Sequence, residues 1–417
     1  MSTPAPPASA SVPADVFAAF SRQLSAAPHR LMFFAGAAAV IVSMLWWALV
    51  LHAARFGWPM PAPPVHPGWA HAVLAMYGMF GPFLFGFLLT VFPRWLARPA
   101  LTRRDYVPVF AGVFGGYVLS HVGLLGMKPV LVLGLVLMLG GWALGLIALG
   151  RVIFAFPGRD QHALSVYAAL HLGAFGLASY LLHALGGPPA LARVAITLGL
   201  FGLLLPVYFS VCHRMIPFFS ANVLRGYRVV RPAWSLKVLW GLLALRMALV
   251  TLETARWLWP VDLALAAFFA GHWIAWQPWK ARRPALLTVL YAAFAWLPLA
   301  FVLFAVQDMA LWWNGSTVLG RAPQHALTVG YFGSMLVAMV TRVTQGHSGR
   351  PLVLGRVPAL CFLAVQFVAV MRIASEFTRD QAFWLALTAC AWLLAFLPWV
   401  LRSLWIYATP RADGAPG

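Results

Sequence analysis

The sequence has 417 residues, of which 62% are hydrophobic and only 9% are charged. Soluble domains are about 45–50% apolar and about 25% charged, so this composition excludes a soluble globular protein, a disordered chain, a coiled coil and a secreted disulfide-rich domain. It predicts an all-α, polytopic membrane helix bundle. The net charge of +20 then belongs at the membrane surface, and we expect no nucleic-acid partner.

In chain order, residues 1–28 are rich in Ala, Pro and Ser and lack the apolar core of a signal peptide, so we expect a disordered cytoplasmic tail. A spanning helix needs about 20 mostly apolar residues. Residues 29–408 are expected to form one transmembrane domain, and 409–417 a second short cytoplasmic tail. Twelve runs in this domain predict about twelve spans: 31–53, 70–92, 106–126, 129–150, 162–185, 192–213, 235–256, 261–279, 285–306, 324–341, 357–376 and 382–407.

The basic residues indicate the orientation of these spans. If the N-terminus lies inside, the inner segments hold most of the 29 Lys and Arg residues. Of the nine acidic residues, five lie on the outer side: Glu253, Asp262, Asp308, Glu376 and Asp380. An excess of Lys and Arg marks the cytoplasmic side of short loops. We therefore predict that both termini lie in the cytoplasm and that anionic lipid faces the basic rim.

Histidines are the most informative polar residues at membrane depth. His71, His121, His183 and His325 fall on four different spans, and each is expected near the outer end of its span. Neutral imidazole is a common ligand of haem iron and copper, and helix bundles build such sites from facing helices. The alternative for each single histidine is a hydrogen bond to a neighbouring helix. The band as a whole favours a haem or redox-metal site.

Two arginines also lie near membrane depth, Arg246 and Arg372. Glu376 follows Arg372 by one helical turn, so an ion pair between them is the expected role. The alternative is that the Arg372 guanidinium binds a haem propionate. Arg246, His171 and His272 are expected near the midplane, where secondary transporters bind their substrates, so a transporter of a small solute stays an alternative function.

The stretch 325–352 carries the most distinctive motif, HALTVGYFGSMLVAMVTRVTQGHSGRPL. It resembles the NnrS family pattern H-A-L-T-V-G…M…A-M-x-T-R-x-x-x-G-H-x-G-R-P-L. Further blocks agree with the family over residues 28–408. They are PHR at 28–30, GFLLT at 86–90, LLH at 181–183, RMIPFFS at 214–220 and MR at 371–372.

This resemblance implies a bacterial inner-membrane protein that carries haem and copper and is linked to nitric oxide, nitrosative stress and denitrification. By position, the family's functional histidines correspond to His71, His183, His325 and His347, and Met76 follows His71 in the same segment. The family's W-H-x-H-E-M pattern is Trp69-Ala70-His71-Ala72-Val73 here, so one histidine and the glutamate are missing.

The depth of the histidines and the resemblance to the family together lead to a hypothesis about the metal and the cofactor. His71 and His325 are the expected axial ligands, by analogy with the second and tenth helices of haem–copper oxidases. His121, His183 and His347 are further candidate metal ligands, and His183, Arg372 and Met76 are candidate cofactor contacts. No CxxCH occurs, so haem would be bound non-covalently.

The expected ligand is nitric oxide or another small diatomic molecule. An enzyme converting it would need an electron donor, which no motif identifies, and no catalytic residue is assigned. A haem-based sensor or assembly factor without turnover is therefore a further alternative.

Overall fold

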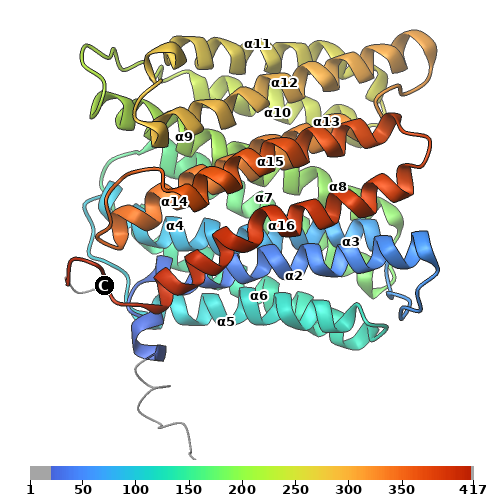
Figure 1. Ribbon diagram of the computed structural model, residues 1–417, viewed down its shortest axis with the longest axis horizontal. Coiled ribbons are helices and arrows are strands. Elements are labelled where there is room, and N and C mark those ends of the chain that lie inside the picture. The colour runs from blue at the N-terminus through green and yellow to red at the C-terminus, as the bar shows by residue number, and fades with distance from the viewer. Residues whose placement is uncertain (1–19, 415–417) are drawn as a thin grey trace, which may run out of the picture.

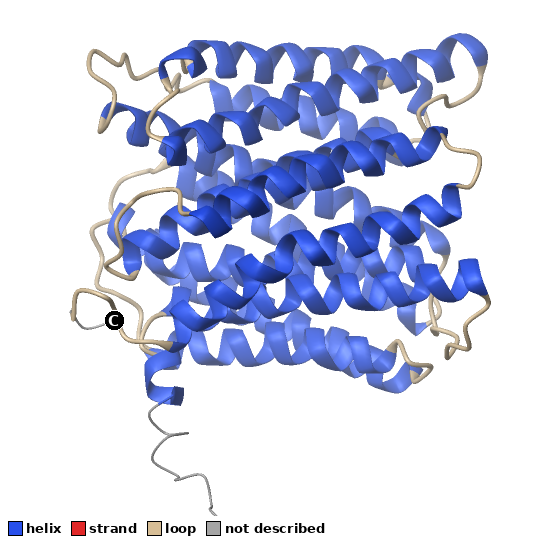
Figure 2. Cartoon of the chain, viewed as in Figure 1, coloured by secondary structure: helices blue, strands red, loops and turns tan. Residues whose placement is uncertain are grey.

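The chain forms a bundle of long helices in a computed structural model that describes residues 20–414 (Figures 1 and 2). No strand occurs within these residues, as the composition predicts. The first part of the predicted N-terminal tail, 1–19, and the last residues of the second tail, 415–417, lie outside the described residues. In chain order the helices are α2 (Pro28–Phe56), α3 (Pro67–Val73), η1 (Leu74–Met79), α4 (Phe80–Trp95), α5 (Arg103–Gly123), α6 (Lys128–Phe154), α7 (Gln161–Leu185), α8 (Pro189–Thr197), η2 (Leu198–Leu204), α9 (Leu205–Ala221), α10 (Ser235–Thr251), η3 (Ala255–Trp257), α11 (Trp259–Ala275), η4 (Pro278–Lys280), α12 (Ala285–Asn314), α13 (Ala322–His325), η5 (Ala326–Gly333), α14 (Ser334–His347), α15 (Arg356–Ala374), η6 (Ser375–Phe377) and α16 (Gln381–Ala408).

Ten helices of the described chain are long and apolar enough to cross a membrane. All twelve predicted runs form helices, but α10 and α11 have only 17 residues each, fewer than the roughly 20 that a span needs. Both end earlier than predicted because the backbone becomes left-handed at Glu253 (φ 56°) and at Gln277 (φ 59°). A residue other than glycine in this region ends a helix. Counted by length and composition, residues 20–414 therefore contain ten candidate spans.

The helices run back and forth between the left and the right side of Figure 1, so the bundle has two ends. We call the end that carries Pro28 and Ala408 the terminal face, and the end that carries Phe56 and Pro67 the far face. Both ends of the described chain meet at the terminal face, where the Gln23 side-chain amide donates to the Thr409 carbonyl at 3.3 Å.

The last part of the predicted disordered tail is ordered. Residues 20–24 are helical. Arg103 Nε donates to the Ser25 carbonyl at 2.9 Å, and the Tyr106 hydroxyl donates to the same carbonyl at 2.7 Å. These two contacts tie the segment to the start of α5.

Three spans lie deeper in the bundle than the others. In the most apolar 18-residue stretch of these three spans, 83%, 78% and 83% of the stretch is buried, whereas at most 56% is buried in the other seven spans. These three central spans are Pro67–Trp95, Pro189–Ala221 and Ala322–His347. Each contains one π-helical segment, which is η1, η2 or η5. π-Helical turns are rare and occur frequently at functional sites, so the centre of the bundle is where a site is expected.

Candidate functional site

His71 lies in α3, three residues before η1, at the far face. Its ring stacks on Trp47 of α2, with the ring centroids 4.5 Å apart and the planes at 9°. Its Nδ1 atom is buried and has no hydrogen-bond partner. A buried ring nitrogen without a partner is costly, so this atom is available for a ligand.

His325 is the last residue of α13 and directly precedes η5, also at the far face. Its Nδ1 lies 2.9 Å from the Arg321 carbonyl, so Nδ1–H donates and Nε2 keeps its lone pair. Metal-binding histidines are commonly held in this way, with the second ring nitrogen donating to a carbonyl. The structure brings His71 and His325 within electrostatic range of one another.

Arg372 of α15 lies within electrostatic range of both His71 and His325. Its Nη1 donates to Glu376 at 2.6 Å and to the Ser375 hydroxyl at 2.9 Å. The ion pair that the sequence spacing predicts is therefore present. These contacts fix the guanidinium, and Glu376 balances its charge within electrostatic range of the two imidazoles.

The other histidines of the predicted outer band lie in the last turn of their helices at the far face, but they differ in their contacts. His121 of α5 is buried against Trp46, with ring centroids 6.1 Å apart, and it is within electrostatic range of His71. His183 of α7 bonds to the Gly187 carbonyl through Nδ1 at 3.1 Å and packs its ring against Trp69. His121 thus borders the His71 cluster, whereas His183 contacts α3 through Trp69, two residues before His71.

Two further candidates lie away from this cluster. The Met76 sulfur packs against the backbone of η2, 2.7 Å from where a Cβ on Gly199 would lie. His347 lies at the terminal face, at the opposite end of the 26-residue span that begins near His325. It contacts His29, with ring centroids 4.4 Å apart, and Arg94 and Arg411 act on it electrostatically, which disfavours a bound cation there.

The predicted metal ligands are therefore not gathered around one ion. Among residues 20–414, no group of three or more His, Cys, Asp or Glu side chains is placed to hold a metal. Among the predicted site residues, His71, His325 and Arg372 are therefore the candidates for holding a cofactor, because they lie within electrostatic range of one another.

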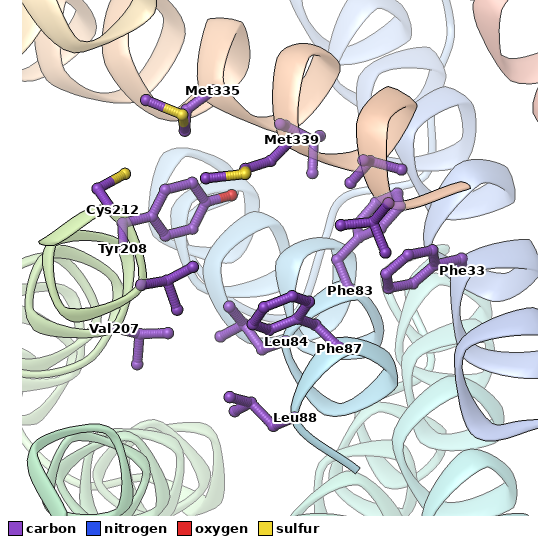
Figure 3. A pocket seen from close by; sticks show the side chains of 14 residues that line it. Phe33, Phe83, Leu84, Phe87, Leu88, Val207, Tyr208, Cys212, Met335 and Met339 are labelled. Atoms are coloured by element: carbon purple, nitrogen blue, oxygen red, sulfur yellow. The ribbon is translucent and has the colours of Figure 1, made fainter. Parts of the chain in front are cut away.

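A small apolar cavity lies deeper in the bundle, between α2, α4, α9 and α14 (Figure 3). Its volume is about 60 Å³, and its lining includes Phe83, Leu84, Tyr208, Cys212 and Met335. Apolar cavities of this kind stay dry and take small uncharged molecules.

A buried charge cluster at the far-face ends of α10, α11 and α12 was not predicted from the sequence. Arg246 forms two hydrogen bonds with Asp262, at 2.6 and 3.2 Å, and Asp308 lies beside this pair. Asp262 is fully buried, although the sequence places it on the outer side. Arg246 and Asp262 each lie about one helical turn from the short loop that joins α10 and α11. Their similar depth is the feature of the sequence from which this ion pair could have been predicted.

A second unpredicted cluster contains three histidines near the terminal face, on α7, α9 and α11. His162 Nε2 lies 3.0 Å from His213 Nδ1, and His272 lies beside His213 with ring centroids 5.8 Å apart. The expectation that His272 lies near the midplane is wrong, because α11 ends at Ala275. His272 Nε2 is bonded to the hydroxyl of Ser235, the first residue of α10, at 2.9 Å.

Asp160 precedes this cluster as the N-cap residue of α7. It accepts hydrogen bonds from the backbone N–H groups of His162 and Ala163 at 3.0 Å, and from Arg214 at 2.6 Å. Burial alone would raise the pKa of the Asp160 carboxyl, but the bonds from Ala163 and Arg214 outweigh it and lower the pKa.

Acid is therefore expected to remove a stabilising contribution of Asp160. A carboxyl with a lowered folded-state pKa contributes stability that is complete above the unfolded pKa of about 3.9 and is lost as the pH falls through the folded value. The midpoint of thermal unfolding, measured in detergent between neutral pH and pH 3, should fall less for Asp160→Asn than for the wild type. Equal slopes in the two proteins would contradict this role.

Comparison with known proteins gives one family. Residues 23–411 match the family model described as NnrS protein, which is nearly the whole chain. No curated protein matches the sequence.

Proposed function

Because this chain belongs to the NnrS family, we propose that it is a multi-span membrane protein that binds haem and takes nitric oxide as its ligand. The observation that carries the proposal is that His71 and His325 lie at the far face within electrostatic range of one another. These histidines precede π-helical segments in two of the three central spans. The resemblance to the family suggests the chemistry, and the positions of the two histidines suggest which residues take part.

The residues present fit a haem. His71 has a buried ring nitrogen without a partner, and His325 has a free Nε2, so each offers a lone pair of the kind that haem iron binds. Arg372 has the charge that a propionate needs. When bound, haem would supply an iron centre for a diatomic ligand. The protein's own part is to hold the two imidazoles: Trp47 fixes the ring of His71, and the Arg321 carbonyl fixes that of His325.

Access for nitric oxide is consistent with the apolar interior. Nitric oxide is small and uncharged, so it partitions into lipid and needs no polar channel. The cavity of about 60 Å³ in Figure 3 offers a second place in the bundle where such a molecule fits.

The absorption spectrum of the purified protein tests this proposal. We expect a haem Soret band in the wild type, and we expect His71→Ala and His325→Ala each to shift it or to lose at least half of the bound haem. The matched control is His171→Ala. His171 is also a histidine in a span, and its Nδ1 bonds to the Tyr167 carbonyl at 2.9 Å, but it is not in contact with the cluster. The absence of haem in the wild type, or unchanged spectra in both variants, would refute the proposal.

Two additions to the same sample separate the remaining alternatives. Anaerobic nitric oxide should shift the Soret band, and consumption of nitric oxide with an artificial electron donor distinguishes an enzyme from a sensor or assembly factor. Metal analysis reports copper. Of the polar residues that suggested a transporter, Arg246 is paired with Asp262 and His272 is bonded to Ser235.

A further inference from the structure

The histidine cluster near the terminal face has no part in the proposed haem site. Its central contact is the distance of 3.0 Å between His162 Nε2 and His213 Nδ1, which is that of an N–H···N hydrogen bond between two imidazoles. In such a bond one ring donates and the other accepts, so a proton can move from one ring to the other without any change in the positions of the heavy atoms. His162 and His213 are both buried.

The inner end of this pair is an unsatisfied atom. His213 is fully buried, and its Nε2 has no hydrogen-bond partner. If His162 donates to His213, this Nε2 carries a hydrogen without an acceptor. If His213 donates to His162, this Nε2 carries a lone pair without a donor. Either state is costly in a buried site, and a buried polar atom without a partner calls for an explanation.

On the surface side of the pair, the Asp160 carboxylate lies next to His162. Asp160 Oδ1 lies 3.8 Å from His162 Nδ1, and Asp160 also lines a cleft of about 450 Å³ together with exposed Phe154, Gly158 and Arg159. The cleft lies at the terminal face, at the start of α7. A carboxylate therefore stands between a surface cleft and the first imidazole of the pair.

The order of these groups runs inward. His162 is the second residue of α7, and His213 lies eight residues before the end of α9. The centroids of the two rings are 5.3 Å apart, so the pair leads from the start of α7 to the fully buried His213. From the cleft, the sequence of groups is the Asp160 carboxylate, the His162 imidazole and the His213 imidazole.

We propose that Asp160, His162 and His213 form a proton-uptake relay that leads from the cleft at the terminal face into the bundle. A hydronium ion in the cleft gives one proton to the Asp160 carboxylate and leaves as water, and Asp160 then passes this proton to His162 Nδ1, which lies 3.8 Å away. The His162 Nε2 proton then passes to His213 Nδ1, so the pair holds one added proton and one added positive charge. No electron moves and no other bond changes.

The charged and titratable neighbours set the balance for that added charge. Asp160 on the α7 side stabilises it, whereas Arg214 on α9, and Arg231 in the segment before α10, oppose it. His272 on α11 already uses both ring nitrogens, because Nε2 is bonded to Ser235 and Nδ1 to the Phe268 carbonyl. The relay therefore consists of the pair and Asp160, and His272 packs beside it.

A shared metal ion is the competing explanation of the short distance between the two nitrogens. Within residues 20–414, however, no set of three metal-binding side chains forms here. A proton fits the same geometry with the ligands present. The relay is independent of whether the chain binds haem.

Nuclear magnetic resonance of full-length protein with ¹⁵N-labelled histidine, in lipid nanodiscs, tests the proposal. The wild type should show ¹⁵N–¹⁵N coupling across the bond between His162 and His213, and this coupling should vanish in His213→Gln. After transfer to D₂O, Asp160→Asn should slow the exchange of these imidazole protons at least tenfold. Asparagine is also a good N-cap residue, so α7 should still form in this variant.

Asp105→Asn is the matched control, because Asp105 is a carboxylate at the same face that pairs with Arg151 at 3.0 Å and lies outside the histidine cluster. It should leave the exchange rate unchanged. An equal exchange rate in Asp160→Asn and in the wild type would overturn the relay. So would a metal ion that is present at one per chain in the wild type and is lost in His213→Gln.

Discussion

Replacement of Arg246 with methionine is expected to destabilise the bundle by about 3–5 kcal/mol, because it leaves the carboxylate of Asp262 buried without its cation. Asp262 is fully buried and Arg246 nearly so, and two hydrogen bonds join them. The guanidinium also lies over the rings of Phe201, at 3.8 Å, and Phe304, at 4.7 Å, so its removal loses these contacts as well. Unfolding in detergent, followed by temperature or denaturant, measures the effect.

Arg193→Met is the matched control for this prediction. Arg193 and Glu253 form a long ion pair of 3.9 Å in which both side chains are largely exposed, and such pairs contribute about 0–1 kcal/mol. The double variant Arg246→Met/Asp262→Leu should regain part of the lost stability, since it removes the buried charge together with its partner. If Arg246→Met cost no more than Arg193→Met, the buried pair would not stabilise the fold as argued.

The second large effect is expected at the contact between α5 and α6. A Cβ on Gly116 would lie 2.4 Å from the backbone nitrogen of Met138 and 2.5 Å from the Gly134 carbonyl oxygen. Because the obstacle is backbone on a neighbouring helix, no side-chain movement can relieve it. Gly116→Ala should therefore separate the two helices and cost about 1–3 kcal/mol or more.

The adjacent residue provides the control for this substitution. A Cβ on Gly115 meets nothing within 4 Å. Gly115→Ala should be neutral or slightly stabilising, because alanine favours a helix by about 1 kcal/mol over glycine. Equal unfolding midpoints for Gly115→Ala and Gly116→Ala would show that the close approach of α5 and α6 does not control stability.

The helices and the depth of the polar residues could be predicted from the sequence. The position of a residue along a span fixes its depth, and His71 and His325 accordingly lie in the same band at the far face. The direction in which each side chain points was not predictable, because it depends on how the helices are rotated against one another. That is why His183 packs on Trp69, why His347 lies with His29, and why the bond between His162 and His213 was missed.

The ends of the two short helices differ in how far the sequence marks them. Hydropathy alone extends α10 and α11 further than they run. The backbone conformation at Glu253 ends α10, and Glu253 is not a strong helix breaker. Gln277 ends α11 and is followed by Pro278, which disfavours helical backbone in the residue before it, so this signal was present in the sequence. By contrast, nothing in the run of apolar residues marks where a π-helical segment begins.

The π-helical segment η1 also changes the directions in which the side chains on its two sides point around the helix axis. Twelve residues separate His71 from Phe83, which in an uninterrupted α-helix would place them about 120° apart around the axis. A π-helical turn takes up roughly one extra residue, which shifts everything beyond it by about 100°. The histidine at the far face and the cavity-lining phenylalanine are thereby brought to within roughly 20° of the same angular position. Removal of a single residue from η1 would rotate one half of this span against the other, so the length of this span, and not only its composition, is under constraint.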